Sequence, residues 1–284
     1  MDIIHTFEVY QKQLDNLRKN NHYGRPQVLR QFRMQFKGFS DTDISLLKSF
    51  LVDNDKKWFV AHLLDNLDTF PVDLLKPMLQ AAVDEPDPSF NNEFVKPCRR
   101  VFDYVDIQNI LLDTFRRGDK DKKIGVLKVL YWARPTVYSM TVHSGDTISQ
   151  QKGYDDFVWD EELKEYNYDF NFVEDESVFE KESRRQEAIY IEQVKTILSE
   201  FYKTADIDLK YQIALRLPKE LEDYPEELKI EAKAFLYNKA KQGIPTNISE
   251  LDKVQNIESS FLRKLLLKTK RIFKKDKGIT LKQR

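Results

Sequence analysis

The sequence predicts an all-α protein, an α-solenoid of stacked antiparallel helix pairs interrupted once by a long acidic insert. Pairs of amphipathic helical patterns recur about every thirty residues between Tyr23 and Arg134, with units starting near residues 24, 55, 89 and 120. Glycine is scarce, with 8 in 284 residues, which argues against sandwiches, barrels and Rossmann-type folds whose turns need positive φ. Hydrophobic residues make up 41% of the chain, enough for burial to offset chain entropy.

The N-terminal elements follow from apolar spacing and from turn residues. The first predicted helix carries four apolar residues spaced 3, 4 and 3 apart on one face: Phe7, Tyr10, Leu14 and Leu17. Residues 25–38 and 41–53 are predicted to form a helical hairpin. The turn between them, Gly38-Phe39-Ser40-Asp41, supplies a C-terminal glycine and the N-cap of the next helix.

The next two units are predicted in the same way. Asp55 is expected to cap a helix whose apolar stripe runs to Phe70, and Pro71 opens a second helix over 72–83, where a missing N–H costs little. Ser89 is expected to cap a helix over 90–104, and Asp106 one over 107–117. A further helix is predicted over 120–133 after the break at Gly118-Asp119.

An acidic and aromatic insert is predicted over residues 135–183. Residues 154–182 contain 12 acidic and 2 basic residues, a net charge of −10. An alternating pattern, with Thr136, Tyr138, Met140 and Val142 at every second position, indicates a strand or an extended turn. Within the insert we single out three aromatic residues as candidate partner-binding anchors: Trp159, Tyr166 and Tyr168.

Helical periodicity returns near Ser183. Helices are predicted over 206–217, over 226–242 after Pro225, and over 249–273. The last 22 residues, 263–284, contain 10 basic residues and 1 acidic residue, a net charge of +9. The predicted organisation is a helical-repeat segment (1–134), the insert (135–183), a second helical-repeat segment (184–273) and a basic tail (274–284).

Two stretches resemble HEAT or armadillo-type repeats. Residues 74–88, LLKPMLQAAVDEPDP, are similar to the second helix and inter-repeat turn of such a repeat, and residues 118–127, GDKDKKIGVL, to the turn and first helix of one. The resemblance implies a non-enzymatic surface that binds a peptide, a helix or a partner domain. The unit spacing lies nearer the ~34 residues of tetratricopeptide repeats than the ~40–47 of HEAT and armadillo units, so the repeat subfamily stays open.

No motif for catalysis, a metal or a cofactor accompanies the pattern. The four histidines are scattered without metal-ligand spacing, and His62 is expected to be a core or half-buried residue. Neither a Gly-x-Ser-x-Gly motif nor a Gly-rich phosphate loop occurs. Cys98 is the single cysteine, which fits a reducing compartment. With no signal peptide or long apolar run expected, we predict a cytoplasmic protein without a cofactor.

Two alternatives to a protein partner follow from basic segments. Residues 96–134 contain 10 basic and 5 acidic residues, and several of them could align along one face to hold a nucleic-acid backbone. This alternative includes the hypothesis of a DNA-repair glycosylase, because one HEAT-like family excises damaged bases. The basic candidates for partner binding are Arg99, Arg100, Arg116, Arg117, Lys120 and Lys123.

The second alternative is a membrane surface. Residues 257–273 combine apolar residues on one stripe with neighbouring lysines and arginines, the pattern of a basic amphipathic helix on anionic lipid. The competing interpretation is a terminal helix that caps the repeat stack.

The leading hypothesis is a non-enzymatic protein-binding scaffold or adaptor. A version of it is a specific inhibitor of a basic enzyme or toxin, because a negative insert steers basic partners. The insert has two further interpretations, a surface loop packed on the helices or a flap that covers the basic segment 96–134.

Overall fold

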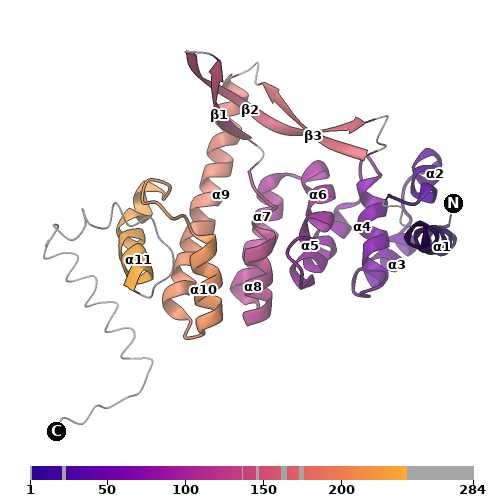
Figure 1. Cartoon of the computed structure of the whole chain (residues 1–284), viewed down its shortest axis with the longest axis horizontal. Coiled ribbons are helices and arrows are strands. Elements are labelled where there is room, and N and C mark those ends of the chain that lie inside the picture. Colours follow the sequence, from indigo (N-terminus) through magenta and orange to yellow (C-terminus); the bar gives the residue numbers. More distant parts are fainter. Residues whose placement is uncertain are drawn as a thin grey trace, which may run out of the picture. The chain divides into compact units, whose positions relative to one another are not determined.

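The computed structural model describes residues 2–20, 24–135, 137–144, 147–160, 165–172 and 176–241 (Figure 1). Within the strands it describes the backbone alone. Eleven α-helices, two short 3-10 helices and three strands lie in the described residues. The helical prediction is therefore confirmed on both sides of the insert. The all-α class is too narrow, because residues of the insert form a small β-sheet.

The chain divides into two compact units, residues 1–189 and 190–284. The division falls inside the long helix α9, Glu176–Lys203. This helix begins seven residues before the predicted end of the insert at residue 183. The insert therefore belongs to the first unit, and we describe the two units separately.

Eight helices form the body of the first unit. Each packs against the next or previous helix in the chain or against one two or three helices away. The packed pairs include α1 with α2, α3 with α4, α4 with α6, α5 with α6 and α8, and α7 with α8. Their bounds are α1 Ile3–Lys19, α2 Gln27–Gln35, α3 Asp41–Leu51, α4 Lys57–Asp65, α5 Leu75–Asp84, α6 Asn91–Val101, α7 Tyr104–Arg117 and α8 Lys120–Val129. A 3-10 turn, Val72–Leu74, follows Pro71 and leads into α5.

The core of this unit lies between the helices and contains the predicted apolar stripes. Phe59, Leu63, Phe94 and Phe115 are almost completely buried. Such large side chains contribute most of the free energy of burial, about 1.5–3 kcal/mol each. The N-terminal part of α9 joins this core, since Ile189 packs with Tyr104 and Leu112 of α7.

Some helix starts differ from the prediction. Ser40 caps α3 as expected and forms a capping box with Asp43. Asp103, rather than Asp106, caps α7: its Oδ1 accepts a hydrogen bond from the Val105 N–H at 2.7 Å, so α7 starts three residues early. Ser89 does not cap α6, which follows Phe90 without a side-chain cap. Asp55 does not cap α4 either, because the chain turns once more before this helix begins at Lys57.

The insert forms an antiparallel sheet in the order β1-β2-β3. The strands are β1 Val137–Ser144, β2 Thr147–Asp160 and β3 Glu165–Phe172. Three of the alternating residues, Tyr138, Met140 and Val142, lie on β1, which confirms the indication of a strand there. The same period of two continues in β3, where an aromatic residue stands at every second position from Tyr166 to Phe172. That period was the available signal for β3.

The second unit contains the C-terminal part of α9, then α10 Ile207–Arg216, a 3-10 turn Glu226–Leu228 and α11 Lys229–Lys241. Phe201 of α9 packs edge-on against Phe235 of α11, with ring centroids 4.9 Å apart. Residues 242–284 lie outside the described residues, and with them the predicted helix 249–273 and the basic tail 274–284. Among the helices that the structure describes, none combines the length and apolar character that crossing a membrane requires.

Candidate functional site

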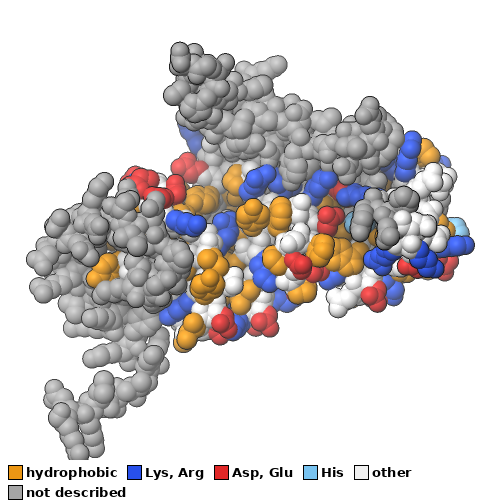
Figure 2. Space-filling view, viewed as in Figure 1, with side chains coloured by type: hydrophobic (Ala, Val, Ile, Leu, Met, Phe, Trp, Pro, Cys, Tyr) orange, Lys and Arg blue, Asp and Glu red, His pale blue; other side chains and the backbone are white. Residues whose placement is uncertain are grey.

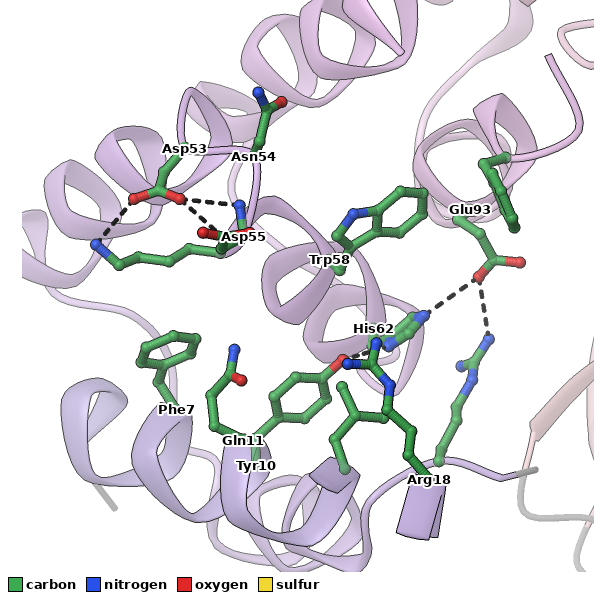
Figure 3. A pocket seen from close by; sticks show the side chains of 14 residues that line it. Phe7, Tyr10, Gln11, Arg18, Asp53, Asn54, Asp55, Trp58, His62 and Glu93 are labelled. Atoms are coloured by element: carbon green, nitrogen blue, oxygen red, sulfur yellow. Dashed lines mark hydrogen bonds and ion pairs between the residues drawn. The ribbon is translucent and has the colours of Figure 1, made fainter. Parts of the chain in front are cut away.

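A cleft of about 1040 Å³ opens in the first unit between α1, α4, the start of α6 and the turn that joins α3 to α4 (Figure 3). Phe7, Tyr10 and Gln11 of α1 project toward α4 across this cleft. Aromatic and charged side chains share the lining, which consists of Phe7, Tyr10, Gln11, Leu14, Arg18, Arg25, Asp53, Asn54, Asp55, Lys56, Trp58, His62, Phe90 and Glu93. We refer to it as the N-terminal cleft.

A chain of polar contacts forms one end of the N-terminal cleft. The Tyr10 hydroxyl lies 2.8 Å from Nδ1 of His62, and Nε2 of His62 lies 3.6 Å from Oε2 of Glu93. Arg25 lies between two carboxylates, 3.8 Å from Glu93 and 2.5 Å from Asp65. Because these contacts join α1, the segment just before α2, α4 and α6, they hold this end of the cleft in one shape.

The pKa shifts of the residues in these contacts indicate which groups are charged near neutral pH. Burial raises the pKa of Tyr10 to about 12, so the phenol keeps its proton near neutral pH. The hydrogen bond from His62 outweighs the effect of burial and lowers the pKa of Glu93, which therefore stays ionised.

The arrangement of hydroxyl, imidazole and carboxylate resembles a catalytic triad in order, but not in chemistry. A nucleophile must be activated and must reach the substrate. Tyr10 is only 1% exposed and is harder to deprotonate than free tyrosine. His62 is half-buried, as the sequence predicted. These residues therefore stabilise the cleft rather than perform nucleophilic catalysis.

Aromatic rings form the wall of the cleft. Trp58 packs against Phe90 and Phe94, with ring centroids 5.4 and 5.1 Å away. Phe94 is buried and fixes the ring from behind, whereas Phe90 is about half exposed. Aromatic side chains that stay partly exposed and lose little entropy on binding are suited to anchor a ligand.

The turn between α3 and α4 forms the opposite end of the cleft. Asp53 accepts hydrogen bonds from the N–H groups of Asp55 and Lys56 at 2.9 and 3.3 Å. Its carboxylate also lies 2.9 Å from the Lys56 ammonium, and these bonds lower the pKa of Asp53. The turn thus has a defined shape, in which Asn54 and Asp55 are exposed.

Several polar groups of the cleft are not used within the fold. In the described part of the chain, the side chains of Gln11, Arg18, Asn54 and Asp55 form no hydrogen bond or ion pair, and the Trp58 indole N–H donates to no acceptor. Side-chain amides both donate and accept. The cleft therefore offers an aromatic wall together with polar groups that can bind a ligand.

The predicted basic candidates do not gather on one face. Arg99 is buried, with 6% of its surface exposed. The Arg100 guanidinium donates to the backbone carbonyl oxygens of Leu64 and Asp68 at 3.0 and 3.2 Å, and so binds the C-terminal end of α4. These two arginines serve the fold and are not presented as a binding surface.

The other four basic candidates lie near the junction of α7 and α8. Arg116 is exposed, and Arg117 pairs with Asp113 at 2.8 Å. Lys120 is half-buried, and the Lys123 ammonium lies 6.0 Å from the centre of the Phe115 ring. On the face seen in Figure 2, basic and acidic side chains are interspersed over the described helices. This distribution does not support a continuous basic track for a nucleic acid.

The aromatic candidates of the insert come together in the sheet. Trp159 of β2 is the register partner of Tyr166 of β3, and Phe157 is the partner of Tyr168. Register partners and alternate residues share a face of a sheet, so all four occupy the same face. Sequence reasoning selected three of them from composition, and the register supplies their neighbourhood.

The residues of the N-terminal cleft were not predicted as a site. No signal in the sequence joins Tyr10 to His62, which are 52 positions apart. A metal centre receives no support, since His, Cys, Asp and Glu do not cluster in a metal-binding group within the described residues. Comparisons with protein-family models, with curated proteins and with solved structures return no match to the chain.

Proposed function

We propose that this protein is a non-enzymatic binding scaffold that holds a peptide segment of a partner protein in the N-terminal cleft. The observation that carries the proposal is the combination of an aromatic wall at Trp58 with polar side chains that have no partner in the described fold. A peptide supplies both matching features, namely apolar side chains and a backbone that donates and accepts hydrogen bonds.

The architecture that we propose for the helices is a HEAT or armadillo-like solenoid. Its support is the order of contacts, in which α5 packs against α6 and α8 while α4 packs against α3 and α6. In such repeats a helix pair contacts its neighbours and leaves a long surface open to a partner. The acidic-aromatic insert is proposed as a second docking element, with Trp159, Tyr166 and Tyr168 on one face of its sheet.

The test is a selection of random twelve-residue peptides on the full chain, followed by affinity measurements with the enriched peptides. We expect to find peptides that bind the unaltered protein and that bind the Trp58→Ala variant at least tenfold more weakly. Tyr131→Ala is the matched control, because Tyr131 is 68% exposed and does not line the cleft. Thermal unfolding of each variant separates lost binding from lost folding.

A second variant keeps this test independent of the core. Gln11→Ala combined with Asn54→Ala removes two amides that lack partners in the described fold, so the free energy of unfolding should change by less than about 0.5 kcal/mol. Reduced peptide affinity in this variant would support binding in the cleft. Enriched peptides that bind all variants equally would place the binding elsewhere and overturn the proposal.

A further inference from the structure

The charges of the N-terminal cleft are separated into two ends. Of the charged residues that line the cleft, Arg18, Arg25 and Glu93 lie at the end near Tyr10; Lys96 and the buried Asp65 lie beside them, outside the lining. Arg25 and Lys96 both lie near Asp65, at 2.5 and 3.7 Å, and Glu93 lies between His62 and Arg25. Apart from His62, this group holds three cations and two carboxylates. The excess positive charge belongs to Arg18, which has no ion-pair partner among the described residues.

Arg18 is positioned to act on a ligand in the cleft. It lies in the last turn of α1 and is exposed. Its guanidinium is close enough to the Tyr10 hydroxyl to favour the ionised form of that group, although burial of Tyr10 dominates. A planar guanidinium with five N–H donors matches the geometry of a carboxylate. This end of the cleft therefore favours an acidic group.

The opposite end carries the opposite charge. Asp53 and Asp55 are two carboxylates, and Lys56 is the one ammonium group that lines the cleft beside them. The Asp53 carboxylate forms an ion pair with that ammonium group at 2.9 Å. Asp55 is exposed and has no partner in the described chain, so it carries the excess negative charge. Between the two ends lies the Trp58 ring (Figure 3).

We infer that the N-terminal cleft selects a peptide in which an apolar or aromatic residue on Trp58 is flanked by an acidic residue at Arg18 and by a basic residue at Asp55. This inference rests on the proposed function, and it adds the chemistry of the bound peptide and the end of the cleft that each of its charges occupies. Two ends of opposite charge select one orientation for a given peptide, because the same peptide turned end for end brings like charges together.

The first experiment reads the residues of the enriched peptides. The expected sequences carry an apolar or aromatic residue between an acidic residue on one side and a basic residue on the other. Peptides that lose affinity for the Trp58→Ala variant but lack these two flanking charges would overturn the inference and leave the proposed function standing. Absence of any peptide that depends on Trp58 would overturn both.

The second experiment exchanges charges across the contact. Arg18→Glu should weaken the best peptide about tenfold, and the same peptide with its acidic residue replaced by lysine should regain affinity. Asp55→Lys should likewise weaken the best peptide, and replacing the basic residue of that peptide by an acidic residue should restore affinity. Lys12→Glu and Asp15→Lys are matched controls, since both residues are exposed on α1 and do not line the cleft.

The reciprocal design makes each outcome decisive. Rescue by the exchanged peptide supports a direct contact between Arg18 and the acidic residue. If Arg18→Glu and Asp55→Lys change affinity no more than the controls do, the charge selection is wrong, even for peptides that bind the cleft. The charge effects should also weaken between low and high salt, because both contacts are exposed.

Discussion

The ammonium group of Lys57 and the carboxylate of Glu85 lie 2.8 Å apart, and their side chains are only 6% and 7% exposed. The pair joins the first turn of α4 to the end of α5, and its lysine stands next to the cleft residue Trp58. The Lys57 ammonium also lies 5.7 Å from the centre of the Trp58 ring. This buried ion pair thus connects the helix packing to the aromatic wall of the N-terminal cleft.

Removing one partner of this pair should destabilise the protein strongly. Lys57→Met leaves the Glu85 carboxylate buried without its cation, which costs about 3–5 kcal/mol. Lys57→Met combined with Glu85→Leu removes both charges and should recover most of that loss, because buried ion pairs contribute little net free energy. Denaturant unfolding of the two variants provides the measurement. Equal stability of the single and double variants would contradict this account.

Gly125 should tolerate no larger residue. A Cβ atom at this position would lie 2.1 Å from the Val83 carbonyl oxygen and 2.9 Å from Val83 Cγ1, where α8 crosses α5. Gly125→Ala must push the two helices apart and should lower the free energy of unfolding by about 1–3 kcal/mol. Gly24→Ala is the control, because no atom lies within 4 Å of its added Cβ. A neutral Gly125→Ala would show that the helices approach less closely.

Arg100 should affect stability and not binding. Arg100→Ala removes the donors for carbonyl oxygens at the end of α4 and should cost about 1–2 kcal/mol in unfolding free energy. Arg117→Ala should change it by less than about 1 kcal/mol, because the pair with Asp113 is exposed. If salt-sensitive affinity for a polyanion fell in Arg100→Ala while stability did not, the assignment of Arg100 to the fold would be wrong.

Glu93 should contribute to the acid sensitivity of the protein. Its pKa is lowered from 4.5 in the folded chain, mainly by the hydrogen bond with His62. A carboxyl with a lowered pKa stabilises the fold above its unfolded pKa, and this contribution is lost as the pH falls through the folded value. Glu93→Gln should therefore show a smaller loss of stability on acidification below about pH 4.5 than the unaltered protein.

The measurement for Glu93 is the free energy of unfolding by denaturant between about pH 3 and 7, a range that spans the usual pKa of a carboxyl group. Asp15→Asn is the control, since Asp15 is exposed and has no partner among the described residues. An unchanged pH profile in Glu93→Gln would contradict the proposed contact with His62.

The local signals that predicted the helices were apolar spacing and turn residues. Ser40 capped α3 as expected, and Pro71 preceded the turn into α5. Asp103 caps α7 although the prediction placed it inside the helix over 90–104; Asp103 and Asp106 are both of a residue type that caps helices. The choice between them depends on where α7 meets its neighbours, which a single stretch of sequence does not contain.

The candidate site was less predictable than the helices. Composition indicated Arg99 and Arg100 as candidates, but Arg99 is buried and Arg100 donates to carbonyl oxygens at the end of α4, more than thirty positions away. Trp159 and Tyr166 were selected as aromatic residues in an acidic segment, and only the register of β2 and β3 paired them. Neither Arg18 nor Asp55, which was predicted only as a helix cap, gave a signal of binding, because an exposed charge is the ordinary state of such residues.

By itself, the sequence determined the helical character of the chain and the presence of a distinct acidic-aromatic insert. These properties follow from neighbours within a few positions, through the periods of 3.6 and 2 residues and through capping. Tertiary structure alone decided which charges are buried, which helices meet at Gly125 and which side chains surround the N-terminal cleft. The physical reason is that Tyr10, His62 and Glu93 come together through the burial of three separate helices, and no local pattern encodes that contact.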